Sequence, residues 1–296
     1  MSLMDTLRFI VNHPLNRDRK AQALLNFLKW QVGSRLVPGA VLFDWVAGTR
    51  VVVRPGDTGM TQNLYCGLQE FEDMAYLLHV LTSEDLFVDV GANVGSYTLL
   101  AAGVRGARAW CFEPVPLTCQ RLIDNLTVNN LSTRVKVLNI GLSGENGELC
   151  FTSTQGTCNH VVSVPNGQGH LVTVPVRTLD SILETESPSM LKIDVEGFET
   201  AVLAGATATL NSPALHSVLI ELNGSGARYG FDEDRIVQTL TAYGFAPYQY
   251  SPFTRELRQL MGKNPAAGNT LFLRNVNLIR ERVSGAPRLR IRSREL

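Results

Sequence analysis

The sequence lacks several features that would assign it to other classes of protein. Its 27 Lys and Arg residues equal its 27 Asp and Glu residues, so the formal net charge is zero and a nucleic-acid-binding surface is not indicated. The five cysteines form no Cys-x-x-Cys pair, which argues against a zinc ribbon and a disulfide framework. No apolar run approaches the roughly 18 residues of a membrane span, and charged residues interrupt the N-terminal segment before a secretory signal could form. We therefore expect a cytoplasmic protein with no membrane span.

The apolar segments that are present predict an α/β fold. With 296 residues, 45% of them hydrophobic, the chain can bury a large core. Short apolar runs alternate with helical patterns, which is typical of a mostly parallel sheet with right-handed crossovers. The seven expected strands are 86–90, 108–112, 135–140, 190–195, 217–222, 245–250 and 270–274. A ligand would lie in the crevice beyond their carboxyl ends.

Four regions follow one another along the chain. Residues 1–83 combine helical patterns, the last over 67–81, with a hairpin, and we expect them to form a lid. Residues 84–275 form the core, interrupted at about 146–180 by β segments between Gly and Asn turns, which predict an inserted hairpin or small sheet. Residues 276–296 are rich in Arg and are interpreted as a flexible basic tail. The alternative for this tail is weak contact with an anionic membrane surface.

The most informative segment is a strand that runs into a glycine turn at residues 86–98. Gly91 and Gly95 have no Cβ, so the backbone can turn sharply and approach a ligand, and Asn93 tolerates a left-handed conformation. The helical pattern that follows would direct unpaired N–H groups at this ligand. Asp89, at the end of the strand, would repel a pyrophosphate and attract a cationic centre. The segment therefore predicts a nucleotide-binding turn for a ligand that carries positive charge.

An acidic residue, Glu113, follows the second expected strand. In a βαβ unit such a side chain can accept hydrogen bonds from both ribose hydroxyls. The alternative for an acid at a strand end is a helix cap or a solvated charge. The dinucleotide fingerprint Gly-x-Gly-x-x-Gly is incomplete, because Asn93 replaces the middle glycine and Thr98 stands where the third is expected. NAD is therefore disfavoured but not excluded.

Two motifs resemble those of the FkbM branch of class I S-adenosylmethionine-dependent methyltransferases. They are Asp89-Val-Gly-Ala-Asn-Val-Gly95 with Phe112-Glu-Pro114, and Leu191-Lys-Ile-Asp-Val-Glu-Gly-Phe-Glu199 with Val202-Leu-Ala-Gly-Ala206. The resemblance runs from about residue 67 to 272 and implies a Rossmann-like sheet and methyl transfer to an oxygen, most often of a sugar hydroxyl. Residues 13–36 are more particularly similar to enzymes that O-methylate fucose, at its 2-hydroxyl, on the lipochitooligosaccharides of nodulation.

The resemblance also implies S-adenosylmethionine as the cofactor, held by the glycine turn and the strand ends. The residues expected to bind it are Asp89, Gly91, Asn93, Gly95, Tyr97, Glu113, Ser143 and Asp194. Tyr97 would flank the methionine moiety or merely fill the helix face, and Ser143 would lie at the adenine edge.

Three acidic residues are the candidates for catalysis: Asp194 and Glu196 after the fourth strand, and Glu221 after the fifth. Asp194 and Glu196 are two positions apart, so their side chains share one face. An attacking hydroxyl must lose its proton, and neighbouring like charges raise a carboxyl pKa, so we favour a general base that also orients the acceptor, without a metal. A divalent cation held by the three carboxylates is one alternative. Capping of the next helix by Glu196 and Gly197 is the other.

Absent motifs restrict the acceptor. Neither Asn-Pro-Pro-Tyr nor Asp-Pro-Pro-Tyr occurs, and no Pro-Cys pair offers a nucleophile for methylation of a base carbon. The expected partner is therefore a glycan, glycolipid, secondary metabolite or other small molecule with a hydroxyl group, and not a nucleic acid. Two other functions stay open: an NAD-dependent sugar oxidoreductase, and a catalytically silent module that binds S-adenosylmethionine.

Overall fold

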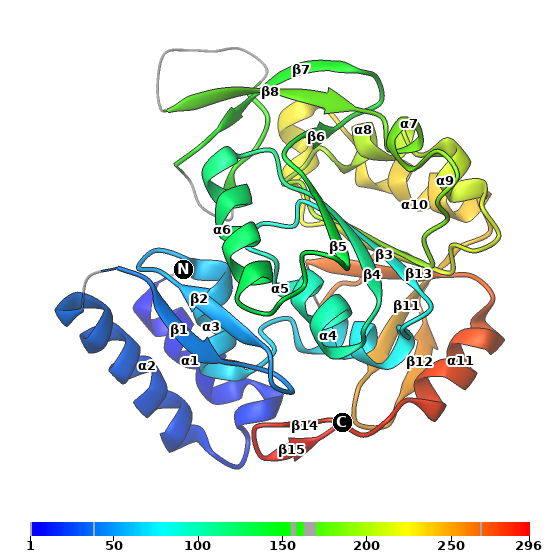
Figure 1. Cartoon of the computed structure of the whole chain (residues 1–296). Coiled ribbons are helices and arrows are strands. Elements are labelled where there is room, and N and C mark those ends of the chain that lie inside the picture. The colour runs from blue at the N-terminus through cyan, green and yellow to red at the C-terminus, as the bar shows by residue number, and fades with distance from the viewer. Residues whose placement is uncertain (1, 38, 155–157, 163–169, 267) are drawn as a thin grey trace.

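An eight-stranded, mostly parallel sheet forms the centre of the molecule (Figure 1). The computed structural model describes residues 2–37, 39–154, 158–162, 170–266 and 268–296. In spatial order the strands are β12 (Glu256–Gln259), β11 (Ala246–Ser251), β13 (Asn269–Leu273), β10 (Ser217–Glu221), β9 (Met190–Ile193), β3 (Leu86–Val90), β4 (Arg108–Phe112) and β5 (Val135–Leu138). The five from β10 to β5 pair in parallel, whereas β13 runs antiparallel to both of its neighbours.

The predicted α/β fold is confirmed, and each of the seven expected strands is present. β3 is buried along its whole length, as its continuous apolar sequence indicates. The eighth strand, β12, was not predicted. Its sequence Glu-Leu-Arg-Gln is mostly exposed at the edge of the sheet, where no apolar pattern is needed.

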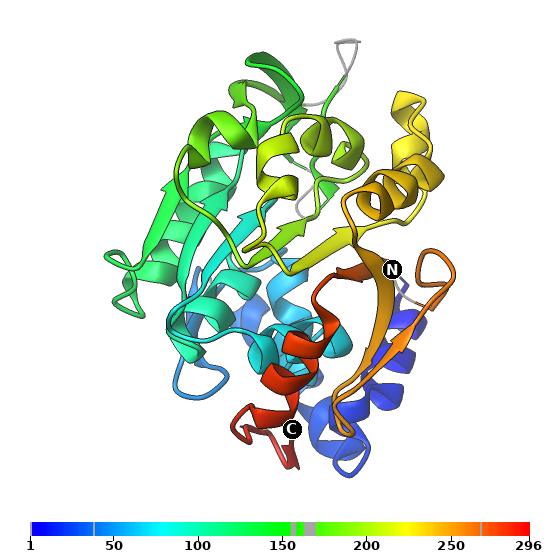
Figure 2. The same cartoon turned by 90° about the vertical axis from the view of Figure 1, so that its right-hand side faces the viewer.

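Helices cover both faces of the sheet, as the two views in Figures 1 and 2 show. One face packs against α4 (Phe71–Val80), α5 (Ser96–Thr98) with the π-helical η2 (Leu99–Val104), α6 (Pro116–Thr127) and α11 (Val276–Gly285). The other packs against α7 (Leu179–Leu183), α8 (Glu199–Ala204), α9 (Thr207–Asn211) and α10 (Glu233–Ala242). Along β3, Phe87 faces the first layer and Val88 the second, because successive side chains of a strand point to opposite faces.

The N-terminal region packs beside this core. Its elements are α1 (Leu3–Asn12), η1 (Pro14–Asn16), α2 (Lys20–Leu36), the antiparallel pair β1 (Val41–Asp44) and β2 (Arg50–Val53), and α3 (Thr58–Cys66). The helix expected over 67–81 is present as α4, but it begins only at Phe71, because Gly67, with a φ of 91°, follows the end of α3 at Cys66 and is not helical. The residues of α4 from Met74 to Val80 are buried against the sheet, so α4 belongs to the core and only the residues before it can form a lid.

The insertion forms a small sheet of its own, in the order β6-β8-β7. Its strands are β6 (Gly141–Leu142), β7 (Gly147–Thr152) and β8 (Leu171–Arg177). Phe151 also forms an isolated bridge to Val161, at the start of the β segment expected over 161–164. Residues 163 and 164 lie outside the described residues.

The C-terminal segment 276–296 is folded, which corrects the expectation of a flexible tail. It forms α11 and the two-stranded sheet of β14 (Arg290–Ile291) and β15 (Arg294–Glu295). Ile279, Val283 and Ile291 are buried, and in Figure 2 this red segment lies against the body of the molecule. The arginines suggested a solvated terminus, but the apolar side chains between them pack into the core. Among the described residues, none of the helices is long and apolar enough to cross a bilayer.

A half-buried ion pair anchors α11, and it generates a first prediction. Arg282 Nη1 donates to both oxygens of Asp85, at 3.0 and 2.9 Å. Burial raises the pKa of Asp85, but the hydrogen bonds from Arg282 and Thr82 lower it below its ordinary value. Asp85→Asn is therefore expected to cost about 1–3 kcal/mol of stability near pH 7. The pKa of Asp85 is lower in the folded protein than in the unfolded chain. The stability difference between wild type and variant is therefore fully present above the unfolded pKa of Asp85, and it is lost as the pH falls through its folded pKa.

Urea unfolding at several pH values measures the difference. Asp18→Asn is the matched control, because it removes an exposed pair with Arg294 and should cost well under about 1 kcal/mol. Equal losses in the two variants would contradict an anchoring role for Asp85.

Candidate active site

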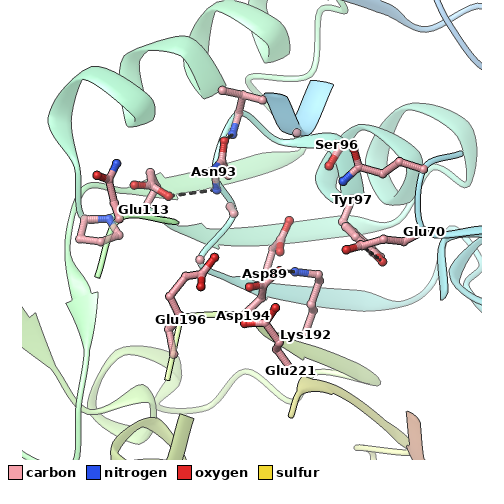
Figure 3. Close-up of a pocket in the computed structure, with 18 of the residues that line it drawn as sticks. Glu70, Asp89, Asn93, Ser96, Tyr97, Glu113, Lys192, Asp194, Glu196 and Glu221 are labelled. Atoms are coloured by element: carbon pink, nitrogen blue, oxygen red, sulfur yellow. Dashed lines mark hydrogen bonds and ion pairs between the residues drawn. The ribbon is translucent and has the colours of Figure 1, made fainter. Parts of the chain in front are cut away.

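A cavity of about 260 Å³ opens at the carboxyl ends of β3, β9 and β10. We call it the strand-end cavity. The side chains discussed below are Glu70, Asp89, Asn93, Ser96, Tyr97, Glu113, Lys192, Asp194, Glu196 and Glu221 (Figure 3). Six of these are acidic and one, Lys192, is basic. The cavity therefore carries an excess of negative charge.

The glycine turn forms as predicted. Gly91 has a φ of 78° and Asn93 a φ of 50°, both in the left-handed region. A Cβ on Gly91 would lie 1.8 Å from the backbone oxygen of Asp194, so only glycine fits where the turn passes the end of β9. The N–H groups of Gly91 and Ala92 both donate to the carbonyl oxygen of Phe112, at 3.0 and 3.1 Å. These bonds join the turn to the next strand.

Glu113 connects the end of β4 to this turn. Its carboxylate accepts hydrogen bonds from the N–H groups of Asn93 and Val115, each at 3.0 Å. Burial raises the pKa of Glu113 to about 7. The residue lies in the cavity wall beside the turn, as the sequence predicted.

Asp89 is buried beneath the turn. Its Oδ2 accepts a hydrogen bond of 2.7 Å from the hydroxyl of Thr98. Its Oδ1 is buried and has no hydrogen-bond partner within the described part of the chain. Burial raises the pKa of this carboxyl group. A buried carboxylate oxygen without a partner is costly, so the cavity offers an acceptor for a ligand.

The sequence analysis did not identify Lys192, the one basic side chain among the described residues of this wall. Its Nζ lies 2.7 Å from Asp194 Oδ2 and 4.7 Å from the ring centre of Tyr97. Burial lowers the pKa of Lys192, but the nearby carboxylates of Asp194, Asp89 and Glu70 raise it above its ordinary value. A lysine within the otherwise apolar strand Met-Leu-Lys-Ile is the signal that could have found it.

Tyr97 and Glu70 form the floor next to Lys192. The Tyr97 hydroxyl donates a 2.6 Å hydrogen bond to Glu70 Oε2, and the ring is buried. Burial raises the pKa of both groups. Tyr97 thus fills the helix face and lines the cavity at once. Glu70 was missed because it lies in the loop before α4, far from the motifs in sequence.

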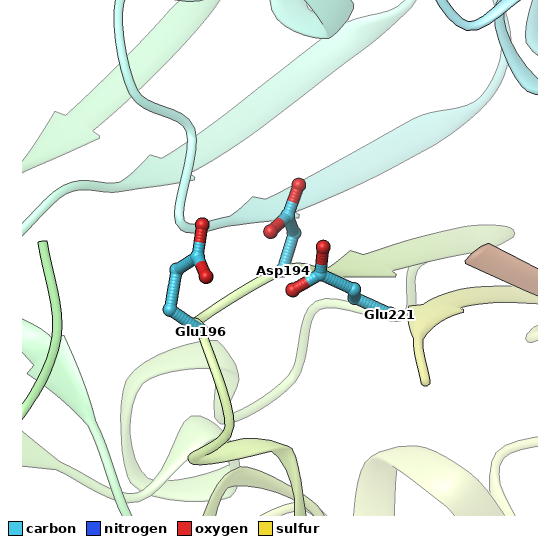
Figure 4. A group of neighbouring side chains, drawn as sticks. All are labelled: Asp194, Glu196 and Glu221. Carbon is cyan, nitrogen blue, oxygen red and sulfur yellow. The ribbon is translucent and has the colours of Figure 1, made fainter. Parts of the chain in front are cut away.

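The three candidate catalytic residues come together, as Figure 4 shows. One carboxylate oxygen each from Asp194, Glu196 and Glu221 lies within 4.8 Å of the others. Burial and the charge of Asp194 raise the pKa of Glu196 to about 7. The same causes, with Glu196 added, raise the pKa of Glu221 well above its usual range. Oxygen ligands at this spacing could also hold a divalent cation.

The capping interpretation of Glu196 is wrong. Glu199 Oε1 instead accepts the N–H groups of Val195 and Gly197, each at 3.1 Å. Glu196 has a φ of 55°, lines the cavity, and holds its carboxylate beside those of Asp194 and Glu221 (Figure 4). The backbone conformation at Glu196 thus serves to direct its carboxylate into the site.

Two predicted site residues, Gly95 and Ser143, do not line the strand-end cavity. Gly95 instead packs against Leu122, 2.3 Å from the place its Cβ would occupy. Ser143 lies elsewhere. It is buried after β6, where its N–H donates to the carbonyl oxygen of Arg177 at 3.0 Å. The carbonyl oxygen of Ser143 lies so close to Gly205 that a Cβ built on Gly205 would be only 2.1 Å from it. The adenine contact expected of Ser143 stays a prediction.

The open side of the cavity is formed by segments outside the central sheet. Gly59 and Gln62 of α3 line it, together with Gln69 from the loop before α4. Phe151 of β7 and Asn159 add the insertion to the same wall. The N-terminal region and the insertion thus both face the carboxylate group formed by Asp194, Glu196 and Glu221.

The sheet order and the strand-end cavity built on a glycine turn define a Rossmann-like α/β fold. A sequence model of the methyltransferase FkbM domain matches residues 89–247. The chain belongs to the FkbM methyltransferase family. The family predicted from the motifs is therefore confirmed.

Individual relatives match over part of their length. Hexuronic acid methyltransferase AglP from Haloferax volcanii is 32% identical over 149 residues, which cover 50% of this chain and 59% of that protein. Methyltransferase sdnD from Sordaria araneosa is 28% identical over 169 residues, 46% of this chain and 65% of that protein. The crystal structure of methyltransferase FkbM from Methylobacillus flagellatus KT aligns with 17% identity and a TM-score of 0.46, over 86% of this chain and 60% of that one. The chain thus spans less than two thirds of each of these proteins.

The buried lysine leads to a second prediction. Lys192→Met would leave Asp194, Asp89 and Glu70 without their cation, which is expected to cost about 3–5 kcal/mol. Asp89 and Glu70, whose pKa values burial already raises, would then take up protons on folding more readily, so the loss should be larger near pH 8 than near pH 6.

Unfolding midpoints at both pH values measure this effect. Lys136→Met is the control, because Lys136 is exposed and lies 3.7 Å from the ring centre of Trp110, where removal should cost about 1 kcal/mol or less. A loss in Lys192→Met that does not change with pH would contradict the electrostatic role.

Proposed function

We propose that this enzyme transfers a methyl group from S-adenosylmethionine to a hydroxyl oxygen of a sugar-containing acceptor. The observation that carries the proposal is the charge of the strand-end cavity, with six acidic side chains and one basic side chain in its wall. A cleft lined by charge of one sign attracts a ligand of the opposite sign. S-adenosylmethionine supplies a methyl group on a positively charged sulfur, which an acceptor oxygen attacks in line.

The residues of the turn fit such a cofactor. Asp89 Oδ1 is a buried acceptor without a partner among the described residues, so a ligand amino or hydroxyl group would satisfy it. Glu113 stands at the end of the second strand of the βαβ unit, the place from which a carboxylate can bind ribose hydroxyls. Gly91 keeps the backbone open between these two side chains.

Among the three clustered carboxylates, Glu196 is the best candidate for the general base. Asp194 is already paired with Lys192, and the raised pKa of Glu221 keeps it protonated near neutral pH. The pKa of Glu196 is raised to about 7, which is where a base is most effective. In the proposed reaction the acceptor O–H bond would break and its proton would move to Glu196. The oxygen would bond to the methyl carbon as the sulfur–methyl bond breaks, with its electron pair going to the sulfur of the departing S-adenosylhomocysteine.

The proposed class of acceptor rests on the similarity to AglP and on the polar side chains that line the cavity outside the central sheet. AglP is named as a hexuronic acid methyltransferase, which supports a sugar acceptor for this chain. The polar side chains of Gln62, Gln69 and Asn159 offer hydrogen bonds of the kind that hydroxyl groups use. The 2-hydroxyl of fucose on a lipochitooligosaccharide is the narrower hypothesis. The family assignment argues against the NAD-dependent oxidoreductase. Transfer of a labelled methyl group to any glycan would exclude the silent binding module.

Cofactor binding gives the third prediction. Asp89→Asn and Glu113→Gln keep the shape of each side chain and remove its negative charge. Each is expected to weaken S-adenosylmethionine binding by about tenfold or more, since a tenfold change needs about 1.4 kcal/mol. Isothermal titration calorimetry measures the change, with Glu145→Gln, an exposed carboxylate elsewhere, as the control. If the wild-type protein does not bind S-adenosylmethionine, the proposed function is wrong.

The proposed base gives the fourth prediction. Glu196→Gln is expected to lower turnover by about 10²–10⁴-fold while cofactor binding remains. In the wild-type enzyme the rate should rise with pH and level off above about 7, because only the ionised carboxylate accepts a proton, and the variant should lose this dependence.

The assay is transfer of labelled methyl groups to fucose- and hexuronate-containing oligosaccharides. Activity should persist in a chelator, because the proposed base acts without a metal. Chelator-sensitive activity restored by a divalent cation would instead assign Asp194, Glu196 and Glu221 to a metal site.

A further inference from the structure

A second cavity, of about 500 Å³, lies in the N-terminal region. We call it the N-terminal cavity. It is enclosed by α2, the β1–β2 hairpin, α3 and β14, and Figure 1 shows α2 beside this hairpin. It shares no lining residue with the strand-end cavity, although α3 contributes to both: Gly59 and Gln62 to one, Asn63 and Leu64 to the other. The volume lies within the range of about 300–1,000 Å³ that is typical of small-molecule sites.

The walls of the N-terminal cavity are apolar. They include Trp30, Val37, Val41, Phe43, Trp45 and Ile291. Trp30 and Phe43 pack edge to face, 5.7 Å apart. The indole N–H of Trp45 already donates to the carbonyl oxygen of Gly67, at 2.6 Å, so this side chain offers a ligand only its apolar surface. Most of a fitting ligand would therefore be hydrophobic.

Three basic side chains and one acidic one share this wall. Lys29 and Arg290 are exposed, and Arg292 is half-buried with its Nε lacking a hydrogen-bond partner among the described residues. Arg292 has a φ of 57°, and its guanidinium donates to the carbonyl oxygen of Leu64. Asp44 is the acidic member. The excess positive charge and the unpaired Nε would be complemented by one anionic group on the ligand.

Gly33 keeps the N-terminal cavity open. It lies in the interior of α2, where glycine is unfavourable, and a Cβ built on it would meet nothing within 4 Å. Since no neighbour requires glycine there, the effect of its missing side chain is free space beside the apolar wall.

We propose that the N-terminal cavity binds a single-chain amphiphile, with an aliphatic chain along the aromatic wall and a carboxylate or other anion beside Arg292. The site is independent of the methyl-transfer function, because the two cavities have no lining residue in common.

Tryptophan fluorescence tests this proposal directly. Two of the three tryptophans, Trp30 and Trp45, line the cavity, and a brominated long-chain fatty acid quenches indole rings that it contacts. Titration below the micelle concentration should give saturable quenching. A brominated fatty alcohol of equal length should bind at least about tenfold more weakly, because it lacks the anion that Arg292 would bind.

Matched variants locate the site. Gly33→Leu should abolish quenching, because Gly33 lines the cavity, a Cβ there meets nothing within 4 Å, and the larger side chain would take up space that the ligand needs. Gly285→Leu is the control, since that position is also helical, has open space around it and lies outside the cavity. Lys29→Gln with Arg290→Gln should weaken binding of the acid more than of the alcohol. Melting curves show that each variant is folded.

Four results would overturn the proposal: no quenching of the wild type, equal quenching in Gly33→Leu and Gly285→Leu, equal affinity for acid and alcohol, or binding only to anionic phospholipid vesicles and not to the monomeric acid. The last would assign this face to a membrane surface instead.

Discussion

The buried ion pair between Lys192 and Asp194 is the interaction on which the site depends. Several carboxylates converge on the carboxyl ends of β3, β9 and β10, and burial alone would drive them to bind protons. Lys192, fully enclosed and 2.7 Å from Asp194, offsets this by placing one positive charge among Asp194, Asp89 and Glu70. Because one lysine faces several carboxyl groups, these groups can stay ionised while the net charge of the site remains negative. That balance suits a ligand with a single positive charge.

The same strand end connects the proposed cofactor-binding turn to the candidate catalytic carboxylates. Gly91 passes the Asp194 backbone so closely that no side chain fits, and the Asp194 N–H donates to the Val90 carbonyl oxygen at 3.0 Å. Glu113 fixes the other side of the turn through the Asn93 N–H. The turn is therefore in direct contact with the strand end that carries the proposed base. In the proposed reaction this contact would hold the reacting groups in place before the acceptor arrives.

Local pattern was enough to predict the sheet, the glycine turn and the convergence of the three candidate catalytic carboxylates, because parallel strands end at one edge of a sheet. Local pattern failed where the role of a side chain depends on contacts with residues that are distant in sequence. Lys192 was read as part of an apolar strand, and Glu70 reaches the site from a distant loop. Glu199, rather than its neighbour Glu196, caps the turn, a choice that depends on backbone angles. In the C-terminal segment the many arginines indicated a solvated tail. Ile279 and Val283, four residues apart on one helix face, are nevertheless buried.

The central claim is that ionised carboxylates in the strand-end cavity recognise a cationic nucleoside. Glu113 and Glu196 both have their pKa raised to about 7, so a bound positive charge should lower these pKa values and expel protons. Calorimetric titration with S-adenosylmethionine near pH 7, repeated in buffers with different ionisation enthalpies, counts the protons released. The account predicts binding with net proton release and an affinity that rises with pH between about 6 and 8. Absence of binding, or binding without proton release, would contradict it.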